Sequence, residues 1–203
     1  EILIYSVNLK TFHDLRAAGR WDTIALELLR AARALAAAGA DFALIATNTM
    51  HKVFAEVAKA APLPLLDIIA ATAGEAQRLG LARLGLLGTS YTMSDGFYHE
   101  AMAGFGITVL SPPVELREEL HRIIVEELVR GRLETRSKDT YLAAVDHLQA
   151  MGAEGVILGC TEIPLLLSPE DAAIPLLDTA RIHAEAALGM ALSWETSLTD
   201  GAA

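Results

Sequence analysis

The chain has 203 residues, of which 53% are hydrophobic and 21% charged, and its formal net charge at pH 7 is −10. That length predicts one large domain or two small lobes with a sizeable buried core. The negative charge argues against nucleic acid and anionic membrane surfaces as partners. An anionic small molecule remains compatible with it, because backbone N–H groups and a few local cations can hold a carboxylate inside an acidic protein.

The sequence lacks the marks of a membrane or secreted protein. No run of roughly 18 uncharged apolar residues is present and no basic segment precedes an apolar one, so we expect neither a membrane span nor a signal peptide. A single cysteine cannot form an internal disulfide, which agrees with a cytoplasmic location. The chain starts at Glu1 directly in an apolar run, and we expect that an amino-terminal piece is missing.

Predicted strands and helices alternate in the first part of the chain. Residues 2–7 predict a strand that ends in the polar residues Asn8 and Lys10. Further strands are predicted over 42–46 and within 63–69, and helices over 21–38, over 52–61 and up to Leu79. The inward face of the first helix is predicted to hold Leu26, Leu29, Ala32 and Leu35. This β-α-β-α-β-α order is typical of a parallel sheet.

The second part of the chain repeats the alternation. Predicted strands cover 84–88, 107–110, 156–158 and 176–177. Predicted helices cover 95–104, 115–130, 137–151 and 179–194, and residues 196–203 predict a loose tail. The pattern predicts an α/β fold with helices flanking parallel strands, and the lack of a low-complexity linker predicts closely packed lobes with a cleft between them.

The only cysteine of the chain follows a strand predicted to be buried on both faces. The segment Gly152–Pro164 contains a Gly-Ala-acid start, an apolar strand, a small residue and then a polar cluster, and Gly39–His51, 113 positions earlier, has the same architecture. Three pairs of residues match in this alignment: Thr47 with Cys160, Asn48 with Thr161, and Thr49 with Glu162. Because ligands of open α/β sheets bind at the carboxyl ends of the strands, the repeat predicts a site formed by two such ends.

Cys160 has a structural and a functional interpretation. A buried cysteine after an apolar strand is often only a small hydrophobic side chain. Thr161 and Glu162, however, stand where a plain turn more often has Gly, Asn or Asp. A helix beginning after them would favour the thiolate and lower the pKa of the thiol. We therefore expect a functional thiol.

Two other polar strand ends are also open to two interpretations. Thr47, Asn48 and Thr49 suit either an N-cap of the following helix or a site for a carboxylate or ammonium group. The segment Gly88–Thr92 suits either a plain turn or a hydroxyl-rich site, and it lacks the lysine of a phosphate-binding loop.

Other catalytic patterns find little support. No Gly-x-Ser-x-Gly motif for serine hydrolysis occurs. Arg130, Arg132 and Arg136 predict a solvated face, or a side chain that closes over an acidic substrate. No metal site is predicted, because metal-ligand spacing is absent among the histidines: His13, His51, His99, His121, His147 and His183.

The sequence resembles the aspartate/glutamate racemase superfamily, and most closely its aspartate racemase-like branch. The resemblance covers nearly all of the chain and rests on four segments: Ala46–His51, Gly85–Thr92, Gly159–Ile163 and Asp178–His183. It implies two similar α/β lobes with the active site between them, the first lobe comprising residues 1–75 plus 176–203 and the second residues 76–175. Members usually open with a glycine-rich strand that this chain lacks, which agrees with a missing amino-terminal piece.

The resemblance implies cofactor-independent inversion at the α-carbon of an acidic amino acid. In the family, one cysteine thiolate removes the α-proton and a second cysteine returns a proton to the opposite face. Cys160 matches the second cysteine, whereas Thr47 stands at the position of the first. An aliphatic hydroxyl is a far weaker acid than a thiol, so we expect a lopsided racemase that prefers one enantiomer.

The same resemblance implies residues that hold the substrate. The expected ligands of its carboxylates and amine are Asn48, Thr49, Thr89, Thr92, Thr161 and Glu162, with Asn8 and Lys10 as candidates for the side-chain carboxylate. Glu162 stands where glutamate racemases tend to have histidine, which favours the aspartate branch. Related enzymes are commonly dimers, so a homodimer is expected.

Two alternatives from other classes stay open. The superfamily contains decarboxylases that use a single cysteine, and this chain has only one, so a lyase acting on a malonate-like acid is the second candidate. The third is a binding protein for an amino acid that kept the cleft and lost turnover.

Overall fold

The computed structural model describes the backbone of residues 1–200 and the side chains of residues 1–193. The chain divides into two compact units: unit 1 contains Glu1–Ile45 and Met50–Asp67, and unit 2 contains Ala46–Thr49 and Ile68–Ala203. The segment Ala46–Thr49 thus belongs to unit 2, although both of its flanks belong to unit 1. No helix in the described part of the chain is both long and apolar enough to cross a membrane.

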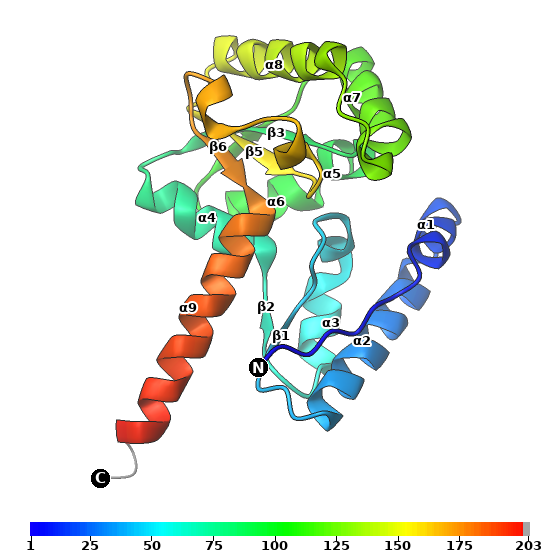
Figure 1. The fold of residues 1–203 in the computed structure, drawn as a ribbon, viewed down its shortest axis with the longest axis vertical. Helices are drawn as coiled ribbons and strands as arrows, with labels where there is room; N and C mark the ends of the chain where they lie inside the picture. Colours follow the sequence, from blue (N-terminus) through cyan, green and yellow to red (C-terminus); the bar gives the residue numbers. More distant parts are fainter. Residues whose placement is uncertain (201–203) are drawn as a thin grey trace. The chain divides into compact units, whose positions relative to one another are not determined.

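Unit 1 packs helices around a short parallel sheet. Its elements in chain order are α1 (Leu9–Ala17), α2 (Trp21–Ala37), β1 (Ala43–Leu44), the 3₁₀ helix η1 (Thr49–Val53), α3 (Phe54–Ala60) and β2 (Leu65–Leu66) (Figure 1). β1 and β2 pair in parallel, with Ala43 opposite Leu65. Apolar side chains from these helices form the core of the unit: Phe12, Ile24, Ala25, Met50, Val53 and Val57.

Two predictions for unit 1 are wrong. Residues 2–7 form no strand in the structure, and Ile2 and Ile4 are 87% and 85% exposed. A strand needs a hydrogen-bonded neighbour, and β1 and β2 pair with each other instead. In α2, Leu26 points outward with 64% exposure, because the buried face runs through Ile24, Ala25, Leu29 and Ala32.

Unit 2 is built on a four-stranded parallel sheet. Its strands are β3 (Arg83–Gly88), β4 (Thr108–Leu110), β5 (Gly155–Gly159) and β6 (Leu176–Asp178), and their spatial order is β4-β3-β5-β6. In the register, Gly88 of β3 lies opposite Gly159 of β5, and Leu158 of β5 lies opposite Asp178 of β6. Every residue of β5 is buried, which confirms the prediction from its continuous apolar run.

Helices cover both faces of this sheet. They are α4 (Ile68–Arg78), α5 (Ser90–Ser94), α6 (Phe97–Ala103), α7 (Val114–Glu126), α8 (Thr135–Ala150) and α9 (Thr179–Asp200), with the 3₁₀ turns η2 (Leu128–Arg130), η3 (Ile163–Leu165) and η4 (Pro169–Asp171). Figure 1 shows α7 and α8 on one side of the sheet and α4, α6 and the start of α9 on the other. The predicted α/β fold with helices flanking parallel strands is confirmed.

Helix boundaries differ from the prediction in three places. The helix expected over 95–104 is preceded by α5 and starts only after Gly96, whose φ of 93° lies in the left-handed region that favours glycine. The helix expected over 115–130 ends at Glu126 and continues as the 3₁₀ turn η2. α9 runs to Asp200, so the loose tail predicted from Thr196 is wrong up to that residue, and 201–203 lie outside the described residues.

The compact units group the chain differently from the predicted lobes. Residues 68–75 and the described part of 176–203 pack within unit 2, whereas the resemblance implied a first lobe that includes them. The sheet of unit 1 has two strands of two residues each in the described chain, against four strands in unit 2. The duplication into two similar lobes with a cleft between them stays a prediction.

Candidate functional site

The carboxyl edge of the unit 2 sheet collects the polar residues that follow its strands. Thr89, Cys160 and Thr179 directly follow β3, β5 and β6, respectively. Because these strands are parallel neighbours, the three residues lie along one edge of the sheet. This is the position at which open α/β sheets bind ligands.

Two glycines allow the ends of β3 and β5 to come close. A Cβ atom on Gly88 would lie 3.0 Å from the carbonyl oxygen of Gly159, and one on Gly159 would lie 3.0 Å from the carbonyl oxygen of Leu87. The side chain of Thr92 packs over the pair, with carbon atoms 3.3 Å from both Cβ positions. A side chain at either glycine would therefore displace the strand ends that carry the polar residues.

The thiol of Cys160 is buried and hydrogen-bonded to a carboxylate. Its side chain is 9% exposed, and Sγ donates to Oε2 of Glu162 at 3.0 Å. The hydroxyl of Thr161 donates to the same oxygen at 2.8 Å. Burial, followed by the negative charge of Glu162, raises the pKa of the Cys160 thiol. At neutral pH the sulfur therefore carries its proton.

The predicted lowering of this thiol pKa is wrong. The expected helix after Cys160 is only the three-residue 3₁₀ turn η3, which begins at Ile163. So short a turn has no substantial macrodipole, whereas burial and the neighbouring carboxylate both disfavour a thiolate.

Three threonine hydroxyls form a triangle beside this edge. Oγ1 of Thr49 lies 3.4 Å from Oγ1 of Thr89 and 3.3 Å from Oγ1 of Thr92, and the last two oxygens are 3.1 Å apart. Thr89 also caps α5, because its Oγ1 accepts the backbone N–H of Thr92 at 3.3 Å. Hydroxyl groups rotate to donate or accept, and Thr89, the least buried of the three, is the one most open to a ligand.

Asn48 is held by a buried chain of hydrogen bonds. Its Oδ1 accepts from the hydroxyl of Tyr98 at 3.4 Å, and its Nδ2 donates to Oγ1 of Thr179 at 2.9 Å. The hydroxyl of Thr179 in turn donates to the carbonyl oxygen of Leu158 in β5 at 2.8 Å. The side chains of Asn48 and Thr49 thus bind residues of the sheet edge, rather than acting as an N-cap of the next helix.

Thr47 precedes these two anchored residues. It is half-buried and, like them, belongs to the segment of unit 2 that unit 1 flanks on both sides. Thr47 is the residue directly before Asn48, so the Cα atoms of the two residues are ~3.8 Å apart. The structure therefore brings most of the predicted site residues to one edge of unit 2: Thr47, Asn48, Thr49, Thr89, Thr92, Cys160, Thr161 and Glu162.

Two predicted ligands belong to unit 1 instead. Asn8 is not the end of a strand but the N-cap of α1, its Oδ1 accepting the backbone N–H of Thr11 at 3.2 Å. Lys10 is exposed in that helix and pairs with Asp14 at 2.6 Å. Their role in holding a side-chain carboxylate stays a prediction.

Sequence reasoning gave no role to Tyr98 and Thr179. Thr179 lies in the quoted segment Asp178–His183, and its place directly after a predicted strand was an available signal. Tyr98 carries no such signal, because it is a fully buried residue of α6 at a sequence separation of 50 from its partner Asn48. Both contacts become visible only in the folded chain.

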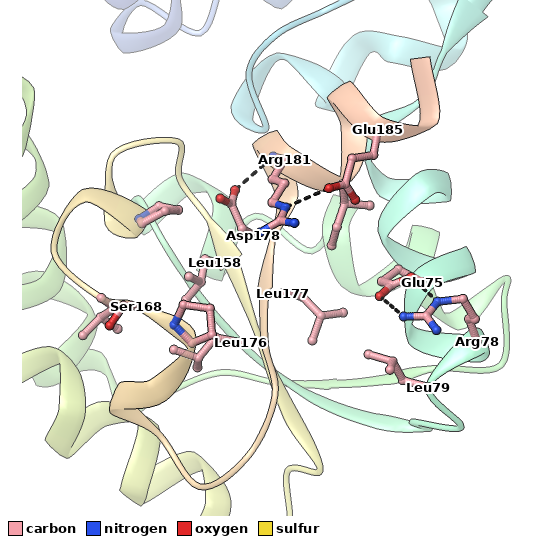
Figure 2. A pocket seen from close by; sticks show the side chains of 14 residues that line it. Glu75, Arg78, Leu79, Leu158, Ser168, Leu176, Leu177, Asp178, Arg181 and Glu185 are labelled. Carbon is pink, nitrogen blue, oxygen red and sulfur yellow. Dashed lines mark hydrogen bonds and ion pairs between the residues drawn. The ribbon is translucent and has the colours of Figure 1, made fainter. Parts of the chain in front are cut away.

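A separate cavity of about 410 Å³ lies along β6 (Figure 2). Its walls come from α4, β6, the start of α9 and the loop before η4, and the candidate residues at the sheet edge do not line it. Both of its arginines are paired, Arg181 with Glu185 at 2.8 Å and Arg78 with Glu75 at 2.7 Å, and Asp178 adds a further negative charge to its lining. The hydroxyl triangle is therefore the better candidate for binding an acid.

The described side chains contain no group of three or more His, Cys, Asp or Glu residues that would suit a metal ion. The site is thus a thiol, a carboxylate and several hydroxyls at the carboxyl edge of a parallel sheet. Together with the fold, this defines an α/β protein with a buried thiol beside a carboxylate at the carboxyl edge of a parallel sheet. The chain belongs to the Asp/Glu/Hydantoin racemase family, whose sequence profile matches residues 1–187.

Individual relatives agree with this membership. A candidate Asp/Glu racemase from Yersinia pestis is 44% identical, with a TM-score of 0.88 over 94% of this chain and 84% of that one. An aspartate racemase homologue from Pyrococcus horikoshii OT3 is 38% identical, with a TM-score of 0.83 over 94% of this chain and 83% of that one. The glutamate racemase of Corynebacterium kroppenstedtii is 31% identical over 140 residues, which are 65% of this chain and 45% of that enzyme. The chain spans about half the length of the glutamate racemases from Corynebacterium kroppenstedtii and Aquifex aeolicus.

Proposed function

We propose that the protein is a cofactor-independent racemase of an acidic amino acid, aspartate or glutamate, in which Cys160 and Thr47 act on opposite faces of the α-carbon. The observation that carries the proposal is the attachment of the Thr47 segment to the edge from which Cys160 emerges. Asn48 bonds to Thr179, and Thr49 approaches the hydroxyls that follow β3. Family membership and the similarity to racemase structures support the same activity.

Glu162 gives this site a preference for a cationic group. Its carboxylate already binds the Cys160 thiol and the Thr161 hydroxyl, so a ligand placed there meets a negative charge. The α-ammonium of an amino acid would pair with that charge. Such pairing offsets the negative charge that, after burial, raises the pKa of the thiol, and this favours Cys160 as a base once the substrate is bound.

The carboxylates of the substrate fit the hydroxyls. In our proposal the triangle of Thr49, Thr89 and Thr92 holds one carboxylate, together with nearby backbone N–H groups. Charge then developing on the α-carboxylate during proton removal is stabilised by donors that are already in place. The amide of Asn48 is occupied by Tyr98 and Thr179, so we assign it to holding the segment rather than to contacting the substrate.

Thr47 is the weaker partner in this scheme. A thiol gives and takes protons near neutral pH, whereas an aliphatic hydroxyl needs help to act as a base. The equilibrium between enantiomers has a constant of one, so kcat/KM for inversion is equal in both directions. The asymmetry is therefore expected in the exchange of the α-proton with solvent, which each face controls separately.

A single-cysteine decarboxylase of a malonate-like acid is the second candidate, favoured by the lone cysteine. The half-buried carboxylate of Glu162 beside the thiol argues against it, because a malonate would bring further negative charge in place of an ammonium group. The homodimer and the cytoplasmic location stay predictions.

Chiral chromatography of reactions with each enantiomer of aspartate and glutamate tests the proposal. We expect conversion of at least one amino acid pair to the racemate, and its loss in Cys160→Ser. Release of carbon dioxide from malonates without inversion of amino acids would support the decarboxylase instead. Thermal stabilisation by an amino acid without any turnover would support a binding protein.

A further inference from the structure

The buried chain of hydrogen bonds through Asn48 has a defined direction. Thr179 has one hydroxyl proton, which it donates to the carbonyl oxygen of Leu158, so its oxygen can only accept from Asn48. The hydroxyl of Tyr98 donates to the remaining polar atom of the Asn48 amide, Oδ1. Tyr98 and Thr179 are fully buried and Asn48 is 2% exposed, which leaves little of this chain to a ligand.

Two members of this chain, Asn48 and the final acceptor Leu158, lie close in sequence to the two proposed proton-transfer residues. Asn48 directly follows Thr47. The acceptor Leu158 lies in β5, two residues before Cys160, which directly follows that strand. The sequence separation between Asn48 and Thr179 is 131 residues, so this contact fixes a long-range relationship that local structure cannot supply.

Thr179 is itself held firmly. It is the first residue of α9, and the preceding Asp178 caps that helix, its Oδ1 accepting the backbone N–H groups of Ala180 at 3.0 Å and Arg181 at 3.1 Å. β6 pairs with β5 at Asp178 and Leu158. The hydroxyl of Thr179 therefore has a fixed place beside β5, from which it can hold Asn48.

We propose that Tyr98 and Thr179 are positioning residues which, through Asn48, hold the Thr47 hydroxyl at a fixed place relative to Cys160. This inference rests on the proposed function, since it gives the two residues a role in the same reaction. Neither side chain touches the substrate in this scheme. Proton transfer to opposite faces of one carbon requires two groups at a fixed distance and orientation, and a displacement of 1 Å costs about a hundredfold in rate.

Thr179→Val tests the proposal, because valine keeps the shape and removes the hydroxyl that joins Asn48 to Leu158. Thr179→Ser restores the hydroxyl. Thr72→Val is the matched control: Thr72 is also fully buried, and its hydroxyl donates to the carbonyl oxygen of Ile68 within α4 at 2.7 Å. All three are compared with the wild-type protein for kcat, KM and backbone amide exchange of residues 46–49.

We expect Thr179→Val to lower kcat for inversion about tenfold to a hundredfold while KM changes less than about threefold. Amide exchange of residues 46–49 should rise at least about fivefold in this variant. Thr179→Ser should return both quantities to within about threefold of wild type, and Thr72→Val should leave both unchanged. An equal loss of kcat in Thr72→Val, or no rescue by serine, would overturn the proposal.

Amide exchange separates this inference from the proposed function. If the wild-type protein inverts no acidic amino acid, the proposed function fails, and with it the catalytic role of the two residues. If inversion is present but residues 46–49 exchange at the wild-type rate in Thr179→Val, the proposed function stands and the positioning role is wrong.

Discussion

Oε2 of Glu162 accepts hydrogen bonds from two neighbours at once, the thiol of Cys160 at 3.0 Å and the hydroxyl of Thr161 at 2.8 Å. Burial first, and then this carboxylate, raises the pKa of the only cysteine of the chain, so its thiol is protonated in the free protein. The Glu162 carboxylate also offers a counter-charge to an ammonium group. In the proposed reaction, this residue would link the protonation of the thiol to the binding of an amino acid.

Glu162→Gln should increase the reactivity of Cys160. Removal of a charge in direct contact shifts a pKa by at least about one unit, so the thiolate fraction at pH 8 should rise about tenfold. Because the chain has one cysteine, alkylation by iodoacetamide measured against pH reports on this thiol alone. Glu118→Gln, at an exposed position of α7, is the control and should leave the rate unchanged. Slower alkylation of Glu162→Gln would mean that the carboxylate activates the thiol.

Thr49→Val should weaken binding of the acidic substrate. A hydrogen bond to a charged group contributes ~1.5–3 kcal/mol, so KM should rise roughly tenfold to a hundredfold. Thr108→Val, at an exposed position of β4, should leave KM unchanged. Steady-state kinetics with the preferred amino acid measure both. An unchanged KM in Thr49→Val would exclude the hydroxyl triangle from carboxylate binding.

Gly159→Ala should destabilise the protein. The new Cβ would lie 3.0 Å from the backbone oxygen of Leu87, which forces a shift of the strands at a cost of about 1–3 kcal/mol. Gly74→Ala is the matched control, because Gly74 lies in α4 with nothing within 4 Å of its Cβ position. Alanine there should stabilise the helix by roughly 0.5–1 kcal/mol. Urea unfolding measures both changes, and equal stabilities of the two variants would contradict the close approach of β3 and β5.

Stability at acid pH should depend on the ion pair of Lys138 and Asp171. Nζ lies 2.7 Å from Oδ1, and this lysine, followed by the backbone and hydroxyl of Ser168, lowers the pKa of Asp171 to about 2. A folded-state pKa below the unfolded one stabilises the fold above the unfolded pKa, near 3.8, and that contribution is lost as pH falls toward 2. Lys138→Gln should therefore lose less unfolding free energy than wild type between pH 6 and pH 3.

Lys59→Gln controls for the loss of a positive charge. Lys59 is exposed in α3, so this variant should show the wild-type dependence on pH. Urea unfolding at pH 6 and pH 3 supplies the comparison. Identical losses in Lys138→Gln and wild type would show that the ion pair contributes nothing.

Local patterns predicted the sheet of unit 2 well. The continuous apolar run before Gly159 predicted a strand buried on both faces, and β5 is that strand. The polar residues Cys160, Thr161 and Glu162 were expected at the carboxyl edge of the sheet, and they follow β5 there. Residues 2–7 show the limit of such patterns, because an apolar run forms a strand only beside a partner.

Long-range contacts escaped prediction. The raised pKa of Cys160 depends on burial and on the direction of the Glu162 side chain, neither of which sequence spacing reveals. The partner of Asn48 lies 131 residues away, and only the return of the chain through β6 brings Thr179 beside it. Both features decide the chemistry of the site.

In the proposed reaction, Cys160 and Thr47 act on opposite faces of the substrate α-carbon with unequal efficiency. An enantiomer whose α-proton faces Cys160 loses it readily and regains a solvent proton from the same sulfur. In heavy water, deuterium should therefore enter this uninverted substrate faster than inversion proceeds. An enantiomer whose α-proton faces Thr47 is inverted almost every time it loses that proton, because Cys160 supplies the new proton from the opposite face. Deuterium should therefore enter the uninverted substrate more slowly than inversion proceeds. Thr47→Val should reduce inversion by about 10²–10⁴-fold and preserve exchange on the Cys160 face.

The most direct measurement compares, in heavy water, the initial rate of deuterium incorporation into the uninverted substrate with the initial rate of inversion, for each enantiomer of aspartate and glutamate. If Cys160 and Thr47 act unequally, the ratio of exchange to inversion should be well above one for one enantiomer and below one for its mirror image. Both reactions should be lost in Cys160→Ser. Equal ratios for the two enantiomers, or exchange that survives Cys160→Ser, would contradict the proposed reaction.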